Sequence, residues 1–133
     1  MRALKLSVLA ILALCGVLAA TPASAQDWTA YTPAAFAEAQ SAGKPIVVHV
    51  HAAWCPTCRA QLPTLDELKA ELAPSGVLFM RVDFDKDKDF LRAHRVASQS
   101  TILTFRGDKE TARSVAQTDR ARLRSLVLGS SQS

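Results

Sequence analysis

The feature that most constrains this chain is a pair of cysteines, Cys55 and Cys58, placed between two different apolar patterns. The seven residues 45–51, Pro-Ile-Val-Val-His-Val-His, are rich in β-branched side chains, which is typical of a buried strand. After the pair, apolar residues recur in steps of three and four, which places them on one face of a helix. This helical face is formed by Leu62, Leu65, Leu68 and Leu72. The sequence therefore predicts an α/β domain with both cysteines at the start of a helix.

That position has a direct chemical use. Unpaired backbone N–H groups and the helix dipole stabilise negative charge at the N-terminus of a helix. They lower the pKa of the Cys55 thiol and favour a thiolate nucleophile. Cys58, two intervening residues away, can reach back to form a Cys55–Cys58 disulfide, so Cys55 is predicted to attack a substrate disulfide and Cys58 to resolve the product. Pro56 suits the first helical turn, where its missing N–H is not needed.

Other uses of the pair remain open. A structural disulfide closing so short a loop would stabilise the fold little. A zinc site would need a second ligand pair, and the sequence holds no second Cys-x-x-Cys. A copper(I) or zinc site formed by Cys55, Cys58 and His51, with His49 as a further ligand, is the alternative function.

The N-terminus resembles a secretory signal. A positive start with Arg2 and Lys5 precedes the apolar residues 8–20, and Ala23-Ser24-Ala25 supplies small residues at cleavage spacing. The apolar stretch is shorter than the roughly 20 residues of a membrane span. We therefore expect cleavage after Ala25, export to the periplasm of a Gram-negative cell, and one domain at residues 26–133.

Removing the predicted signal lowers the length and the net charge of the chain. The chain of 133 residues carries 16 basic and 12 acidic side chains, a net charge of +4. The 108 residues that remain keep 14 basic and 12 acidic groups, a net charge of +2. They hold no block of basic residues with interleaved aromatics, so nucleic acid is not an expected partner. The third cysteine, Cys15, lies within the predicted signal.

The remaining patterns complete one domain of order α-β-α-β-α-β-β-α. A polar tail at residues 129–133 is predicted to be disordered. The helices outside the cysteine region are predicted at residues 33–41, 87–95 and 119–128, and the strands at 45–51, 77–84, 101–105 and 111–116.

The chain resembles the thioredoxin fold along nearly its whole predicted mature length. The motifs that carry this resemblance are Gly43-Lys-Pro-Ile-Val-Val48, Ala53-Trp-Cys-Pro-Thr-Cys-Arg59, Pro63, Arg81-Val-Asp-Phe-Asp85 and Thr101-Ile-Leu-Thr-Phe105. The resemblance implies a central mixed sheet of four strands, or of five, flanked by helices. It also implies that Trp54 packs beside the active site, that Cys55 is the exposed nucleophile and that Cys58 is the buried resolving thiol.

The lead-in, Trp28-x-x-Tyr31 through Gly43-Lys-Pro45, is similar to the C-terminal periplasmic domain of the thiol reductase DsbD. That similarity favours reduction over oxidation. We expect the protein to act as a monomer, without a bound cofactor, on disulfides of exported proteins. An exported reductase also needs a membrane thiol donor, such as a DsbD-like reductase, that returns electrons to the pair. The Pro56-Thr57 dipeptide between the cysteines does not decide the direction of the reaction.

Three positions depart from the family. His49 stands where a buried Asp is usual, and it either transfers protons for Cys58 or is a neutral core histidine. His51, on the same strand face, either holds positive charge near Cys55 or fills an aromatic packing site. Ser100 replaces the cis-proline opposite the cysteines, so its turn is cis or is trans and reshaped. Gln99, Ser100 and Thr101 are the residues expected to pair with the substrate backbone.

Overall fold

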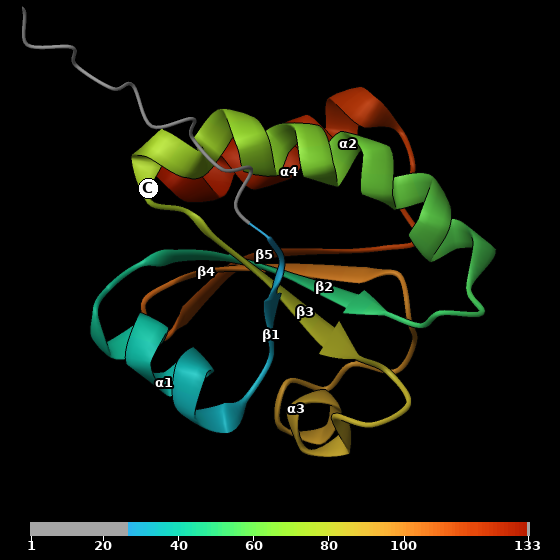
Figure 1. Cartoon of the computed structure of the whole chain (residues 1–133), viewed down its shortest axis with the longest axis horizontal. Helices are drawn as coiled ribbons and strands as arrows, with labels where there is room; N and C mark the ends of the chain where they lie inside the picture. Colours follow the sequence, from blue (N-terminus) through green and yellow to red (C-terminus); the bar gives the residue numbers. More distant parts are fainter. Residues whose placement is uncertain (1–26, 133) are drawn as a thin grey trace, which may run out of the picture.

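The computed structural model describes residues 27–132 (Figure 1). In chain order the elements are β1 (Thr29–Ala30), α1 (Pro33–Ser41), β2 (Pro45–His51), α2 (Pro56–Leu72), a 3₁₀ turn (Ala73–Ser75), β3 (Leu78–Asp83), α3 (Lys88–Ala93), β4 (Thr101–Arg106), β5 (Lys109–Val115) and α4 (Arg120–Gln132).

The strands form one mixed sheet of five, in the order β1-β3-β2-β4-β5. β1 and β2 both pair in parallel with β3, whereas β4 runs antiparallel to β2 and to β5. β2 is therefore a central strand, and its carboxyl end delivers the chain into the cysteine region. The mixed sheet flanked by helices confirms the predicted α/β thioredoxin fold.

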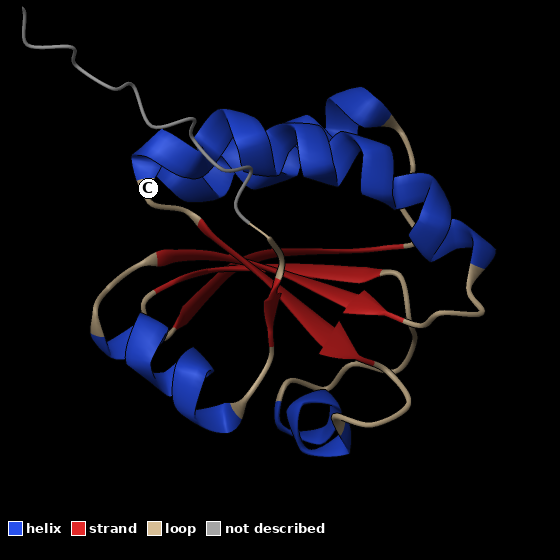
Figure 2. Cartoon of the chain, in the orientation of Figure 1, coloured by secondary structure: helices blue, strands red, loops and turns tan. Residues whose placement is uncertain are grey.

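Helices cover both faces of this sheet (Figure 2). α1 and α3 lie on one face over a core that includes Phe36, Phe90 and Val48. α2 and α4 pack side by side on the other face over a core that includes Leu65, Val47 and Leu123. Because side chains alternate along a strand, β2 supplies both cores from successive residues.

Local sequence explains where the first two helices begin. Thr32 caps α1 with its side chain, which accepts a hydrogen bond from the Ala35 N–H at 3.1 Å, and Pro33 follows at the first helical position. Cys55 caps α2 in the same way with its sulfur, and Pro56 follows. The first thiol is thus part of the helix start itself.

The predicted helix at 33–41 and strand at 45–51 agree with α1 and β2. The helix predicted at residues 119–128 extends further in the structure, because α4 continues to Gln132. Each residue added to an existing helix gains a hydrogen bond, and no proline stops α4 in this stretch. β1, two residues long, is too short to give a periodic signal in the sequence.

The predicted signal, residues 1–25, lies outside the described residues. Within residues 27–132, no helix has both the length and the apolar character needed to cross a membrane.

Candidate active site

The two thiols lie close together after the end of β2, at the start of α2. Both cysteines are reduced, and the Cys58 N–H donates a hydrogen bond to the Cys55 sulfur at 3.0 Å. Cys55 is 1% exposed and Cys58 is fully buried. The expectation of an exposed Cys55 is therefore wrong for this dithiol form. Its sulfur turns inward because its hydrogen-bond partners, including the Cys58 N–H, lie on the protein side.

The surroundings separate the acidities of the two thiols. Burial opposes ionisation of Cys55, but hydrogen bonds from the Cys58 thiol, the Ser100 hydroxyl and the backbone N–H groups of Cys58 and Thr57 outweigh it and lower the Cys55 pKa. Burial raises the pKa of Cys58, and its hydrogen bond to Cys55 raises that pKa further. The pair is therefore poised as one thiolate and one thiol.

Ser100 approaches both sulfurs. Its Oγ lies 3.1 Å from the Cys55 sulfur and 3.2 Å from the Cys58 sulfur. The residue has a left-handed backbone, with φ of 62°, and no peptide bond in the described residues is cis. The turn is thus trans and reshaped, one of the two forms considered from the sequence. A left-handed backbone, and not a cis bond, directs the serine side chain to the cysteines.

Gln61 supports this turn, and the sequence interpretation missed it. Its side-chain N–H₂ donates to the carbonyl oxygens of Ser100 at 3.1 Å and Gln117 at 2.9 Å. Its amide oxygen lies 2.9 Å from His49 Nε2. The available signal was a polar residue on the inward face of α2, one turn after Cys58 and one turn before Leu65.

His49 is buried and held in one tautomer. The Gln61 amide nitrogen donates to two carbonyls, so the Gln61 amide oxygen is the atom that faces His49. Because an amide oxygen only accepts hydrogen bonds, His49 Nε2 carries the proton and donates it to that oxygen. Nδ1 is buried with no hydrogen-bond partner. Burial lowers the His49 pKa to about 4. Within residues 27–132, no hydrogen bond joins the His49 side chain to a cysteine, so the geometry favours the neutral core histidine over the proton carrier.

His51 packs against His49, with ring centroids 5.5 Å apart. Burial lowers its pKa, and the Arg81 charge lowers it further, so the geometry favours the packing role over a positive charge near Cys55. In residues 27–132, no group of three or more His, Cys, Asp or Glu side chains could hold a metal ion. The proposed ligand set of Cys55, Cys58 and His51 is therefore not assembled, and the metal-handling alternative is unsupported.

The remaining predicted neighbours lie around the pair. Trp54 is 56% exposed, and its indole N–H donates to Asp85 at 2.8 Å. Thr101 is buried at the start of β4, and its hydroxyl donates to the Ser98 carbonyl at 2.7 Å. Gln99 is half-buried in the turn between Ser98 and Thr101. Trp54 and this turn thus flank the cysteines, with one large apolar side chain facing solvent.

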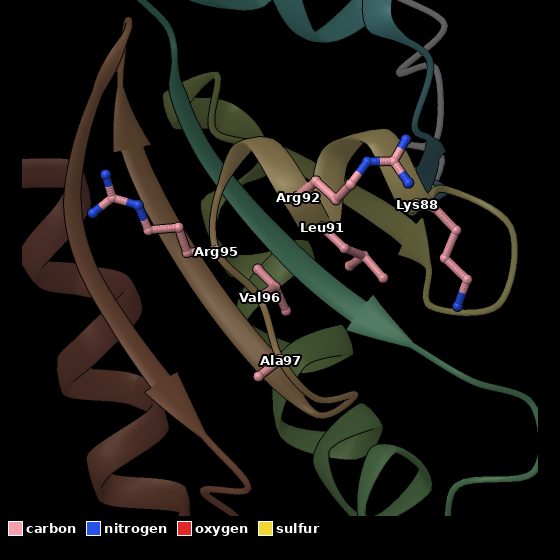
Figure 3. A pocket seen from close by; sticks show the side chains of 6 residues that line it. All are labelled: Lys88, Leu91, Arg92, Arg95, Val96 and Ala97. Carbon is pink, nitrogen blue, oxygen red and sulfur yellow. The ribbon is translucent and has the colours of Figure 1, made fainter.

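A shallow hollow of about 390 Å³ lies beside α3. Its lining includes Leu91 and Val96, and Arg92 and Arg95 extend from it in opposite directions (Figure 3). Neither cysteine lines it. Arg92 is paired with Asp89, so part of the basic charge at the rim is already neutralised.

The sheet order, the helices on both of its faces and the buried dithiol at the start of α2 together define a thioredoxin-like protein-disulfide oxidoreductase. The thioredoxin family model matches residues 28–128, and the chain belongs to that family.

Individual relatives agree with this assignment. The chain is 32% identical to the thioredoxin of Chlamydia trachomatis over 92 residues, which are 69% of this chain and 87% of that protein. It is 30% identical over 88 residues to the bifunctional thioredoxin reductase/thioredoxin of Mycobacterium leprae, matching 66% of this chain but 19% of that protein. The crystal structure of Trxlp from Edwardsiella tarda superposes with a TM-score of 0.72 at 36% identity, covering 76% of this chain and 98% of that one.

Proposed function

We propose that this protein is a periplasmic reductase that exchanges thiols with disulfides of exported proteins. The observation that carries the proposal is the geometry of the pair: Cys55 caps the start of α2 and accepts a hydrogen bond from the Cys58 N–H at 3.0 Å, while Cys58 is fully buried. Hydrogen bonds lower the pKa of Cys55, while burial raises the pKa of Cys58. One cysteine is thus ready to attack, while the other keeps its proton until it is needed.

The reaction uses two exchanges. The Cys55 thiolate attacks one sulfur of the substrate disulfide, which breaks and releases the other sulfur as a thiol after it takes a proton. Cys58 then loses its proton and attacks the Cys55 sulfur, which releases the second substrate thiol. The protein is left with a Cys55–Cys58 disulfide, and two electrons have passed to the substrate.

Three features support reduction and export. The name of the Mycobacterium leprae relative joins a thioredoxin to a thioredoxin reductase, which favours reduction. The predicted signal at residues 1–25 and the DsbD-like lead-in around Trp28 and Tyr31 favour the periplasm. We propose a monomer that is reduced again by a membrane thiol donor and holds no cofactor.

The experiment measures reduction of insulin disulfides by residues 26–133, together with the reduction potential of the pair. We expect catalysed reduction by the wild type and none by Cys55→Ser. Cys58→Ser should accumulate a mixed disulfide through Cys55, because the first exchange proceeds and the second cannot. A Cys55→Ser protein that reduces insulin as fast as the wild type would refute the proposal.

Location is tested separately by fractionating cells that express the full chain. We expect a shortened protein in the periplasm with Gln26 at its N-terminus. A full-length protein in the cytoplasm would contradict export while leaving the exchange chemistry intact.

A further inference from the structure

The Ser100 hydroxyl lies between the two reacting sulfurs. Its Oγ is 3.1 Å from the Cys55 sulfur and 3.2 Å from the Cys58 sulfur, and the residue is 2% exposed. A hydroxyl carries one proton and two acceptor lone pairs, so it can accept from one sulfur and donate to the other at once. Ser100 therefore connects the thiols directly, in a place that solvent hardly reaches.

The Cys58 proton needs such a connection. A thiolate is the nucleophile in disulfide exchange, so Cys58 has to lose its proton before it resolves the mixed disulfide. Its backbone acceptor, the Val50 carbonyl oxygen, lies 3.8 Å away and cannot pass a proton on. In the described chain, the one side-chain hydrogen bond of His49 is to Gln61. Ser100 is left as the side chain beside Cys58 that can both take up and give away a proton.

The hydroxyl is held in place from three sides. The Ser100 N–H donates to the Val50 carbonyl at 2.9 Å, and the Ser100 carbonyl accepts from the Ala116 N–H at 3.0 Å and from the Gln61 side chain at 3.1 Å. These bonds hold a left-handed backbone that serine rarely adopts. Strained conformations of this kind persist where the surrounding structure over-determines them. The hydroxyl is thus pre-positioned for the reaction.

We propose that Ser100 is a catalytic residue that relays the Cys58 proton during resolution of the mixed disulfide. The Cys58 proton passes to Oγ, and the hydroxyl's own proton passes to the departing substrate sulfur. The Cys58 sulfur bonds to the Cys55 sulfur as the bond from Cys55 to the substrate breaks. The substrate leaves as a thiol, the cysteine pair supplies its electrons, and Ser100 ends unchanged. This role rests on the proposed exchange at Cys55.

The test follows resolution separately from the first attack. Reduced protein is mixed with glutathione disulfide, and rapid acid quenching with mass spectrometry records how the Cys55–glutathione adduct forms and decays. Between about pH 6 and pH 8, we expect a weak pH dependence of adduct decay in the wild type. Across this whole range, Ser100→Ala should decay more slowly than the wild type and gain about tenfold per pH unit, because the unaided reaction needs the Cys58 thiolate and burial keeps Cys58 protonated here.

Two further variants complete the design. Ser100→Gly also removes the hydroxyl but adopts the left-handed backbone without steric cost, so it should behave like Ser100→Ala even if the alanine variant folds poorly. Ser98→Ala removes a hydroxyl from the same turn, one that makes no hydrogen bond in the described structure, and should behave like the wild type.

The contrary outcomes are distinct. A loss that is equal at every pH would mean that the hydroxyl only shapes the site, and wild-type decay rates at every pH in both Ser100 variants would mean that no relay exists. Either result overturns the relay. Failure of the proposed function would instead appear as a wild type that forms no adduct at Cys55.

Discussion

At the scale of single residues, His49 shows how burial selects one chemical state. The side chain is fully buried, and the acceptor of its one hydrogen bond in the described structure is the Gln61 amide oxygen. A positive charge there would lose its hydration without gaining a carboxylate partner, so the neutral ring is favoured. Its Trp28 and His51 neighbours pack against the ring at 5.7 Å and 5.5 Å between centroids. These contacts fit a core histidine that supports the turn opposite the cysteines.

The pH dependence of stability tests this state. The His49 pKa is about 4 in the folded protein, against an ordinary value of 6.5. The unfolded chain binds the proton more readily, so the free energy of unfolding falls as pH drops from 6.5 towards 4 and then levels off. The full loss from this residue is about 3 kcal/mol.

Urea unfolding of the wild type and His49→Phe at several pH values measures that loss. The phenylalanine variant loses a hydrogen bond at every pH but cannot titrate at this position. The wild type should therefore lose about 3 kcal/mol more than the variant on acidification. A difference between the two proteins that stays constant with pH would show that His49 is not held neutral.

At the scale of elements, α2 does more than present the cysteines. Cys55 caps its start, Cys58 follows in the first turn, and Gln61 follows in the next. Because residues three apart lie on one helical face, Cys58 and Gln61 point to the same side, where Ser100 lies. Gln61 then binds the carbonyl of Ser100 as well as that of Gln117 before α4. One helix thereby joins the dithiol, the left-handed turn and the segment that leads into α4.

Gln61→Met tests the strength of that connection. Methionine keeps most of the volume but removes both donors and the acceptor, which leaves the His49 N–H and the Gln117 carbonyl without this partner. We expect the free energy of unfolding to fall by about 2–3 kcal/mol. Gln40→Met, at a half-buried site of α1, should change it by less than about 0.5 kcal/mol. Equal stabilities of the Gln61 and Gln40 variants, measured in urea, would refute the connection.

At the scale of the whole molecule, two apolar cores on opposite faces of the sheet hold the helices in place. α4 buries Leu123 and Val127 against the core that α2 and β2 share. On the outer side, Arg124 binds both carboxylate oxygens of Glu71 at 2.7 Å and 2.5 Å. Solvent screens this exposed pair, whereas the apolar contacts remove surface from water.

Two neighbouring substitutions in α4 separate these contributions. Leu123→Ala should lower the free energy of unfolding by about 2–5 kcal/mol, because it removes a fully buried side chain and leaves a cavity. Arg124→Met, one residue along, should leave the urea midpoint close to that of the wild type. A larger loss in Arg124→Met than in Leu123→Ala would show that ion pairs, and not the core, fasten α4.

The bounds of several elements and the fold class could be predicted from short stretches of sequence. β2 and α1 were predicted at their observed bounds, because a β-branched run and a Thr-Pro start act locally. The fold class followed from the same patterns and from the thioredoxin-like motifs. β1 was not foreseen at Thr29–Ala30, since two residues carry no period and become a strand only by pairing with β3.

The cysteine pair and its place at the start of a helix were determined by the sequence alone, since strand and helix periodicity and a cap are properties of neighbouring residues. The burial of Cys55 and the bridging position of Ser100 were decided by the tertiary structure. Cys55 and Ser100 lie 45 residues apart and meet only because β2 pairs with β4 and because Gln61 holds the turn. Such contacts depend on packing across the whole domain, which no local pattern encodes.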